Sequence, residues 1–381
     1  MKRDTKLTRI GRVKTNDQIV NPPIARGSTV LSTNAAELYN PPVGKSHYGR
    51  FGLTTQNALR DALCELSGAD YCAITPSGLS SIVMPLLALV ESGGRVLAAD
   101  CIYGPTRRFL NEGLTRYGVT IDYFDPRMGA DIQTLMDNRV QAVILESPGS
   151  LTFELQDIPA ISKAAHAVGA SVLVDDTWTA SWLMKPLDLG ANIASQALTK
   201  YVGGHSDILL GAAMGRGETA EKIKWAETVY GWHASPDDCW LALRGLRTLG
   251  LRLERSGQSG LAIANWLENR SEVGRVIHPA LPSHPDHAIF KRDFSGSCGV
   301  FAFTLPGYDR KRSEAFLDAL DIFGLGFSWG GFESLAIHCD PQLKRSVTER
   351  HDGALIRLAV GLEDADDLIA DILEALEATA P

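Results

Sequence analysis

The chain has 381 residues, of which 45% are hydrophobic and 22% are charged, an ordinary globular composition with enough length for two domains. The formal net charge of −8 gives no sign of a nucleic-acid partner. The sequence contains no run of about 18 apolar residues, and its basic N-terminal segment lacks the apolar core of a signal peptide. We therefore expect a cytoplasmic protein that does not enter a membrane.

The cysteines and histidines do not form a recognisable metal-binding pattern. The six cysteines are scattered without a CxxC pair, which favours reduced thiols over a disulfide framework. The segment 284–287, HPDH, lies in a proline-rich stretch and is interpreted as a solvated loop. HExxH, GxSxG and the P-loop signature are absent, so metalloprotease, serine hydrolase and ATP chemistry have no support, and no metal is expected.

Residues 1–52 are predicted to form an arm that buries little apolar surface by itself. Proline pairs at 22–23 and 41–42 interrupt any regular element. Near the end of the arm, Tyr48 and Arg50 stand two residues apart, so their side chains point the same way in an extended chain. They are either the end of an ordinary linker or part of a site on another subunit.

Residues 54–66 follow the spacing of an amphipathic helix, and a short strand is predicted at 71–75. The turn 76–81 then opens an apolar helix that runs to about residue 90. The free amides of Gly78 and Leu79 at this helix start would suit an anion such as a phosphate. The alternative is that the serines and glycine merely cap the helix.

Strands and helices alternate from residue 95 to 178, with strands at 95–99, 119–124, 140–145 and 170–174. This order predicts a mostly parallel sheet covered by helices, with ligands bound beyond the carboxyl ends of the strands. Tyr103, Glu146 and Asp175 fall at or just after strand ends. Asp175 suits a metal ligand, a base or an acceptor for a protonated ring nitrogen.

Lys200 lies between an apolar run and the glycine-rich turn 203–204, and an apolar strand is predicted at 208–214. Desolvation by neighbouring chain would lower the pKa of its ammonium group, so that a free amine could form a Schiff base with an aldehyde. The alternative is a surface lysine before a loop.

The C-terminal part, residues 246–381, is predicted to form a smaller α+β domain after the large domain, residues 53–245. A long helix is expected over 237–269, with a break near residues 257–260. Arg357 stands within an apolar strand, where a buried guanidinium needs a carboxylate partner. That partner is either an internal Asp or Glu or the carboxylate of a substrate.

Several separate stretches resemble the Cys/Met-metabolism PLP-dependent enzymes and, within them, the bacterial cystathionine β-lyases. The resemblance covers nearly the whole chain. It rests on YGRFG (48–52), LESPGS (145–150), DDTW (175–178), LTKYVGGHSD (198–207), LALRGLRTLG (241–250) and SWGGFESL (328–335). It implies the aspartate-aminotransferase-like, type I PLP-dependent transferase fold, an α/β fold, with pyridoxal 5'-phosphate as the cofactor and a small amino acid as the substrate.

The resemblance also implies roles for individual residues. Lys200 would carry the Schiff base and act as general base, while Tyr103 would stack on the ring. The cofactor would further be bound by Asp175 at the ring nitrogen, by Gly78, Leu79 and Thr199 at the phosphate, and by Tyr48 and Arg50 from the neighbouring subunit. The substrate would meet Arg357, Ser328, Trp329 and Trp240. The family pattern implies a homotetramer built from two dimers that share active sites.

The implied reaction is β-elimination at the C–S bond of L-cystathionine, giving homocysteine, pyruvate and ammonia. Ala197, Pro105, Trp329 and the turn 148–150 depart from the γ-acting members and favour this reaction. Asp176 and Trp240 depart from the β-lyase pattern and leave the natural thioether open. The alternatives are a broader cysteine-S-conjugate β-lyase or a γ-acting member such as a cystathionine γ-synthase or γ-lyase.

Overall fold

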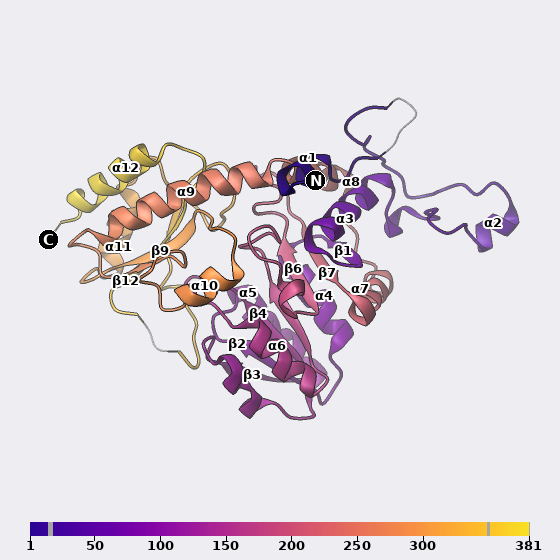
Figure 1. The fold of residues 1–381 in the computed structure, drawn as a ribbon, viewed down its shortest axis with the longest axis horizontal. Coiled ribbons are helices and arrows are strands. Elements are labelled where there is room, and N and C mark those ends of the chain that lie inside the picture. Colours follow the sequence, from indigo (N-terminus) through magenta and orange to yellow (C-terminus); the bar gives the residue numbers. More distant parts are fainter. Residues whose placement is uncertain (14–17, 349–350, 381) are drawn as a thin grey trace.

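The computed structural model describes residues 1–13, 18–348 and 351–380 of the chain (Figure 1). Within them, the larger sheet has seven strands in the order β1-β7-β6-β5-β4-β2-β3. Neighbouring strands from β3 to β6 run parallel, whereas β7 is antiparallel to both β6 and β1. The mostly parallel sheet predicted from the sequence is therefore confirmed. Its strands are β1 (Tyr71–Thr75), β2 (Arg95–Ala99), β3 (Thr120–Phe124), β4 (Val140–Glu146), β5 (Ser171–Asp175), β6 (Ile193–Ala197) and β7 (Gly211–Gly215).

Helices cover both faces of this sheet because successive residues of a strand point to opposite sides. On β1 and β7, Ile74 and Ala212 belong to one apolar core together with α3 and α8. Their neighbours Ala73 and Ala213 belong to a second core with α4, α6 and α7. The bounds of these helices are α3 (Thr54–Ser67), α4 (Gly78–Leu89), α6 (Ile158–Ala167), α7 (Gly217–Tyr230) and α8 (Pro236–Leu246).

The connections on the strand-end side of the sheet are short and irregular. Between β2 and β3 the chain is helical throughout but changes geometry, from α5 (Gly104–Arg108) to the π-helical η2 (Phe109–Gly113) and the 3-10 segment η3 (Leu114–Tyr117). Two further 3-10 segments, η4 (Gly129–Leu135) and η5 (Pro186–Leu189), precede β4 and β6.

A second, five-stranded sheet forms the C-terminal part, in the order β10-β11-β12-β9-β8. All its strand pairs are antiparallel except β10 with β11. A third apolar core lies between this sheet and its helices, centred on phenylalanines of β9. The elements are β8 (Val276–Ile277), α10 (His287–Asp293), β9 (Val300–Leu305), α11 (Arg310–Asp318), β10 (Gly324–Leu325), β11 (Leu335–His338), β12 (Ala354–Ala359) and α12 (Ala365–Ala378).

The long helix α9 (Leu249–Glu268) joins the two parts (Figure 1). Its first half contributes to a core of the larger sheet and its second half to the core of the smaller one. The break expected near residues 257–260 is wrong, because α8 ends at Leu246 and α9 continues through both glycines. A Cβ on Gly257 would lie 2.4 Å from the carbonyl oxygen of Ser297, so this glycine permits close packing rather than a kink.

The N-terminal arm is only partly as expected. Residues 18–52 extend away from the two sheets and contain α2 (Ala35–Tyr39) and η1 (Gly49–Phe51) (Figure 1). The first residues instead form α1 (Arg3–Arg9), which packs on the body of the protein. Leu7 within this helix and Ile10 directly after it are both buried. The predicted domain limits at 52/53 and 245/246 stay predictions.

The described residues show neither a membrane-spanning helix nor a metal-binding cluster. None of their helices is both long and apolar enough to span a membrane. Among the same residues, no group of three or more His, Cys, Asp and Glu side chains is placed to hold a metal ion.

Candidate active site

Functional side chains gather where the parallel strands of the larger sheet end. Glu146 is the last residue of β4 and lies opposite Asp175, the last residue of β5. Lys200 follows the end of β6, and Tyr103 follows the end of β2. Because these ends meet at one edge of the sheet, the structure brings together side chains that are about a hundred residues apart in the sequence.

Lys200 is held against a loop of the C-terminal part. Its Nζ donates a hydrogen bond to Oγ of Ser328 at 2.9 Å and lies 5.4 Å from the ring centroid of Trp329. Burial, together with the positive charge of Arg357, lowers the pKa of Lys200 to about 8, although Asp175 acts in the opposite direction. A fraction of the amine is therefore unprotonated near neutral pH, as a nucleophile or base requires.

Arg357 reaches the same loop from β12. Its Nη2 donates to the carbonyl oxygen of Ser328 at 2.9 Å, so Ser328 joins Arg357 to Lys200. Its Nε is buried without a hydrogen-bond partner among the described residues. Within that part of the chain, no Asp or Glu carboxylate forms a salt bridge with Arg357, and burial lowers the pKa of its guanidinium. Of the two partners open at the outset, the structure favours an external carboxylate.

Asp175 lies at the floor of the site. Its Oδ1 accepts hydrogen bonds from the amide and the hydroxyl of Thr177, at 3.0 and 2.6 Å. Burial raises the pKa of Asp175, while these hydrogen bonds and the charge of Lys200 oppose the shift. Oriented in this way, the carboxylate presents its second oxygen for a ligand group that carries a proton.

Glu146 belongs to the site but was not among the predicted site residues. Its Oε2 accepts a hydrogen bond from the backbone amide of Tyr103 at 2.5 Å. Burial, followed by the nearby charge of Asp175, raises the pKa of Glu146 well above its usual range. Glu146 lines a cavity together with Asp175, Trp329 and Arg357. The position of Glu146 at a strand end was the available signal, but no partner for its carboxylate could be identified from the sequence.

The start of α4 forms a cradle for an anion. Oγ of its N-cap residue Ser77 accepts from the amide of Ser80 at 3.2 Å, so the first amides of the helix, at Gly78 and Leu79, have no intrahelical acceptor. A Cβ on Gly78 would lie 2.4 Å from Cβ of Ala197, which shows that the end of β6 packs directly against this helix start.

Thr199 is fixed beside this cradle by its own hydrogen bonds. Its hydroxyl donates to the carbonyl oxygen of Leu210 at 3.2 Å and accepts from the amide of Leu210 at 2.9 Å. One lone pair of the hydroxyl remains for a ligand. The predicted contact of Thr199 with the phosphate stays a prediction.

Three predicted residues do not join the others within a single chain. Tyr48 is exposed and forms an isolated β-bridge with Thr29 of the arm. Nη1 of Arg50 donates to the carbonyl oxygen of Thr228, near the end of α7, at 3.0 Å. Nε1 of Trp240 donates to the carbonyl oxygen of Pro22 in the arm, also at 3.0 Å. Their predicted contacts with cofactor or substrate remain predictions.

Asp176, which departs from the family pattern, has a structural environment. Its carboxylate is fully buried and points away from Asp175 toward Thr179, Ser181 and Gln196, which donate four side-chain and backbone hydrogen bonds to it. Burial raises the pKa of Asp176 to about 7, against the effect of those donors. Asp176 therefore stabilises the structure behind the site, and its departure from the family pattern says nothing about which thioether is the substrate.

The chain is similar to known proteins over almost its whole length. The family model for the Cys/Met metabolism PLP-dependent enzymes matches residues 4–377. A relative from Rhizobium johnstonii is 47% identical over 97% of this chain and 94% of its own length. The cystathionine beta-lyase MetC of Escherichia coli is 39% identical, with 97% of each chain covered.

The fold agrees as well. A crystal structure of metB from Corynebacterium glutamicum superposes with a TM-score of 0.92 at 26% identity, covering 99% of this chain and 98% of that chain. The predicted type I fold is thereby confirmed. The chain belongs to the Cys/Met metabolism PLP-dependent enzyme family, and pyridoxal 5'-phosphate is its cofactor.

Proposed function

We propose that the protein cleaves the Cβ–S bond of L-cystathionine by β-elimination, giving homocysteine, pyruvate and ammonia. The E. coli relative, similar over nearly the whole length, is named for this lyase activity. One observation carries the proposal: Ser328 joins the buried Arg357 to the amine of Lys200. A guanidinium with open donors suits the α-carboxylate of an amino acid, whose Cα then lies within reach of the lysine.

The residues present fit pyridoxal phosphate. Lys200 supplies an amine of lowered pKa, Asp175 a buried carboxylate and α4 an anion cradle. When bound, the cofactor withdraws electrons from the substrate's Cα. We assign its phosphate to Gly78, Leu79 and Thr199, its ring nitrogen to Asp175 and its ring face to Tyr103.

The chain's own groups then manage the substrate and its protons. Arg357 holds the α-carboxylate, and Lys200 takes the proton from Cα as general base. The electron pair of the broken C–H bond forms the Cα–Cβ double bond while the Cβ–S pair leaves with sulfur. Lys200 returns a proton to that sulfur, which releases homocysteine. Water hydrolyses the remaining unsaturated amino acid to pyruvate and ammonia.

We propose a homotetramer in the cytoplasm, built from two dimers that share active sites. Support comes from the arm, which extends from the body (Figure 1), with Tyr48 bridged to Thr29 and Arg50 bonded to Thr228 of α7. In this assembly both side chains reach the phosphate of the neighbouring subunit's cofactor. The proposal explains why a proline-interrupted arm ends in an aromatic and a guanidinium group.

A substrate panel with product identification tests the function. The purified holoenzyme is incubated with L-cystathionine, L-cystine, djenkolate, and O-acetylhomoserine plus sulfide. We expect pyruvate and homocysteine from cystathionine at the highest kcat/KM of the panel. Formation of 2-oxobutyrate and cysteine would instead identify a γ-lyase. A preference for cystine or djenkolate would indicate a broader cysteine-S-conjugate β-lyase, and reaction only with O-acetylhomoserine a γ-replacing enzyme.

A further inference from the structure

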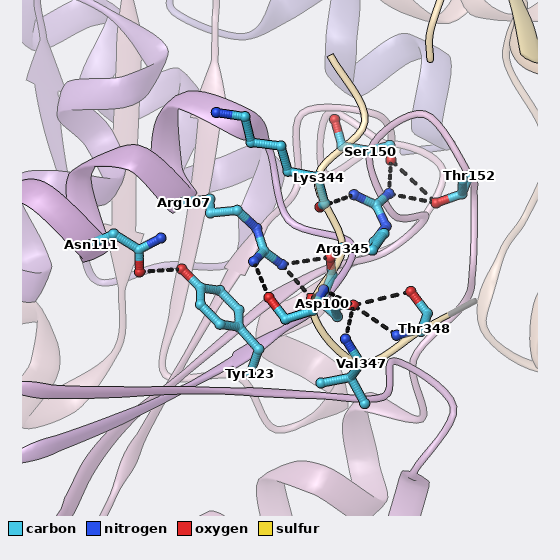
Figure 2. Close-up of polar contacts among 11 residues, drawn as sticks. Asp100, Arg107, Asn111, Tyr123, Ser150, Thr152, Lys344, Arg345, Val347 and Thr348 are labelled. Carbon is cyan, nitrogen blue, oxygen red and sulfur yellow. Dashed lines mark hydrogen bonds and ion pairs between the residues drawn. The ribbon is translucent and has the colours of Figure 1, made fainter. Parts of the chain in front are cut away.

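The loop that carries Tyr103 is fastened to the C-terminal part through one buried carboxylate. Asp100 lies at the end of β2 and is completely buried. It receives hydrogen bonds from the backbone amides of Ser346, Val347 and Thr348, at 2.8 to 2.9 Å (Figure 2). The Thr348 hydroxyl adds a further bond at 3.1 Å. Three successive amides around one carboxylate form a nest for an anion, supplied here by the other part of the chain.

Arg107, four residues after Tyr103, also binds the Asp100 carboxylate. Its guanidinium pairs with the Asp100 carboxylate, donates to Oγ of Ser346 at 2.8 Å and stacks 3.7 Å from the ring centroid of Tyr123 (Figure 2). Its backbone amide donates to the carbonyl oxygen of Tyr103 at 3.0 Å. The ion pair of Asp100 and Arg107 thus joins a residue three positions before Tyr103 to one four positions after it.

A second contact ties the same C-terminal segment to the wall of the site. Nη2 of Arg345 donates to the carbonyl oxygen of Ser150 at 2.7 Å and to the Thr152 hydroxyl at 2.6 Å (Figure 2). The amide of Ser150 donates in turn to the carbonyl oxygen of Cys101 at 2.8 Å. Ser150 lines the cavity shared with Asp175 and Arg357.

The fastened segment is connected to the substrate-binding strand. It belongs to the connection between β11 and β12, and Arg357 lies in the middle of β12. Asp340, at the start of this connection, accepts from the amide of Leu355 at 2.7 Å and contacts the imidazoles of His338 and His351. The connection is therefore held at two places, by Asp100 at residues 346–348 and by Asp340 at Leu355, two residues before Arg357, and the backbone of residues 341–345 joins the two.

We propose that Asp100 is a positioning residue, which fastens segment 345–348 to the Tyr103 loop and so keeps Arg357 in register with Lys200. This inference rests on the proposed function, since it assigns Arg357 to the α-carboxylate. Although burial acts in the other direction, the surrounding amides and Arg107 keep the pKa of Asp100 below its usual range, so it remains an acceptor across the working pH. Loss of the contact misplaces the carboxylate-binding group more than the base.

The test compares Val347→Pro with Val347→Ala in the holoenzyme. Proline removes one amide donor to Asp100, whereas alanine keeps it, and the side chain of Val347 is exposed. We expect V347P to raise KM for L-cystathionine about tenfold, with kcat changed less than about threefold. We also expect faster tryptic cleavage after Lys344 and Arg345. V347A should match the wild type in both readouts.

Asp100→Asn provides a second variant should V347P fail to fold, and Asp188→Asn, at an exposed ion pair with Arg216, is its control. D100N should show the same rise in KM and the same faster cleavage. Wild-type KM together with wild-type cleavage in V347P or D100N would overturn the proposal. If the wild type itself forms no pyruvate from cystathionine, the proposed function fails, while the cleavage rates still decide whether Asp100 fastens the segment.

Discussion

At the scale of single residues, Arg357 combines burial with hydrogen-bond donors that the described chain leaves open. Since hydrogen bonds to charged groups contribute about 1.5–3 kcal/mol, Arg357→Leu should lower kcat/KM roughly 100-fold, mainly through KM. Arg357→Lys keeps the charge without the bidentate fork and should recover only part of the loss. Steady-state kinetics with cystathionine, beside the exposed-site control Arg292→Leu, make the measurement. An unchanged kcat/KM in R357L would show a structural role.

Asp176 offers a test of pH dependence at the same scale. Its pKa rises from an ordinary 3.8 to about 7 on folding, so ionisation weakens the folded state as the pH increases between those values. Asn at this position does not titrate, and its amide can donate to the Thr179 hydroxyl, which itself bonds to the carbonyl oxygen of Met184. The free energy of unfolding of the wild type should therefore fall between pH 5 and pH 8. We expect that of Asp176→Asn to fall by on the order of 1 kcal/mol less over the same range.

Thermal unfolding of both proteins at the two pH values, with saturating cofactor, measures this difference. All other titrating groups are common to the two proteins and cancel. Parallel pH profiles for wild type and D176N would mean that the folded protein keeps Asp176 ionised throughout the range.

At the scale of elements, the junction of α4 with β6 determines the anion cradle. An added Cβ at Gly78 would lie 2.4 Å from Cβ and 2.9 Å from Cα of Ala197, so Gly78→Ala must displace the start of the helix. We expect about tenfold weaker binding of pyridoxal phosphate, which an absorbance titration of the apoenzyme measures. Gly296→Ala, whose added Cβ meets Leu183 at 3.4 Å, is the control. Wild-type affinity in G78A would place the phosphate elsewhere.

The elements also show which features were predictable from sequence. The strand ends that carry Asp175 and Lys200 follow from alternating apolar runs, since local pattern and parallel topology are enough to bring them together. The unbroken α9 was not predictable, because Gly257 is needed for close packing against Ser297, which is distant in the sequence, and not for a bend in its own helix. Likewise, Asp176 and Asp100 find their donors in segments whose position depends on tertiary packing.

At the scale of the whole molecule, the proposed assembly means that one chain does not complete the active site by itself. Asp175 and Lys200 influence each other's pKa within one chain, so they belong to one site of one subunit. Arg50 contacts α7 of its own chain, and we propose that it serves the neighbouring subunit. The two kinds of residue therefore predict opposite results when inactive subunits are mixed.

Mixing Lys200→Ala with Arg50→Ala subunits should restore activity, because each mixed dimer holds one site in which both residues are intact. Every dimer that carries both tags is mixed and holds one native site of two, so roughly half of the wild-type activity is expected. The control mixture, Lys200→Ala with Asp175→Ala, should stay inactive, since each site of that mixed dimer lacks one essential residue. The rate of pyruvate formation from cystathionine is measured after affinity purification of dimers that carry two different tags. An inactive first mixture, despite proven exchange, would place Arg50 outside the neighbouring site. Activity in the control mixture would show that Asp175 and Lys200 of one subunit do not serve the same site.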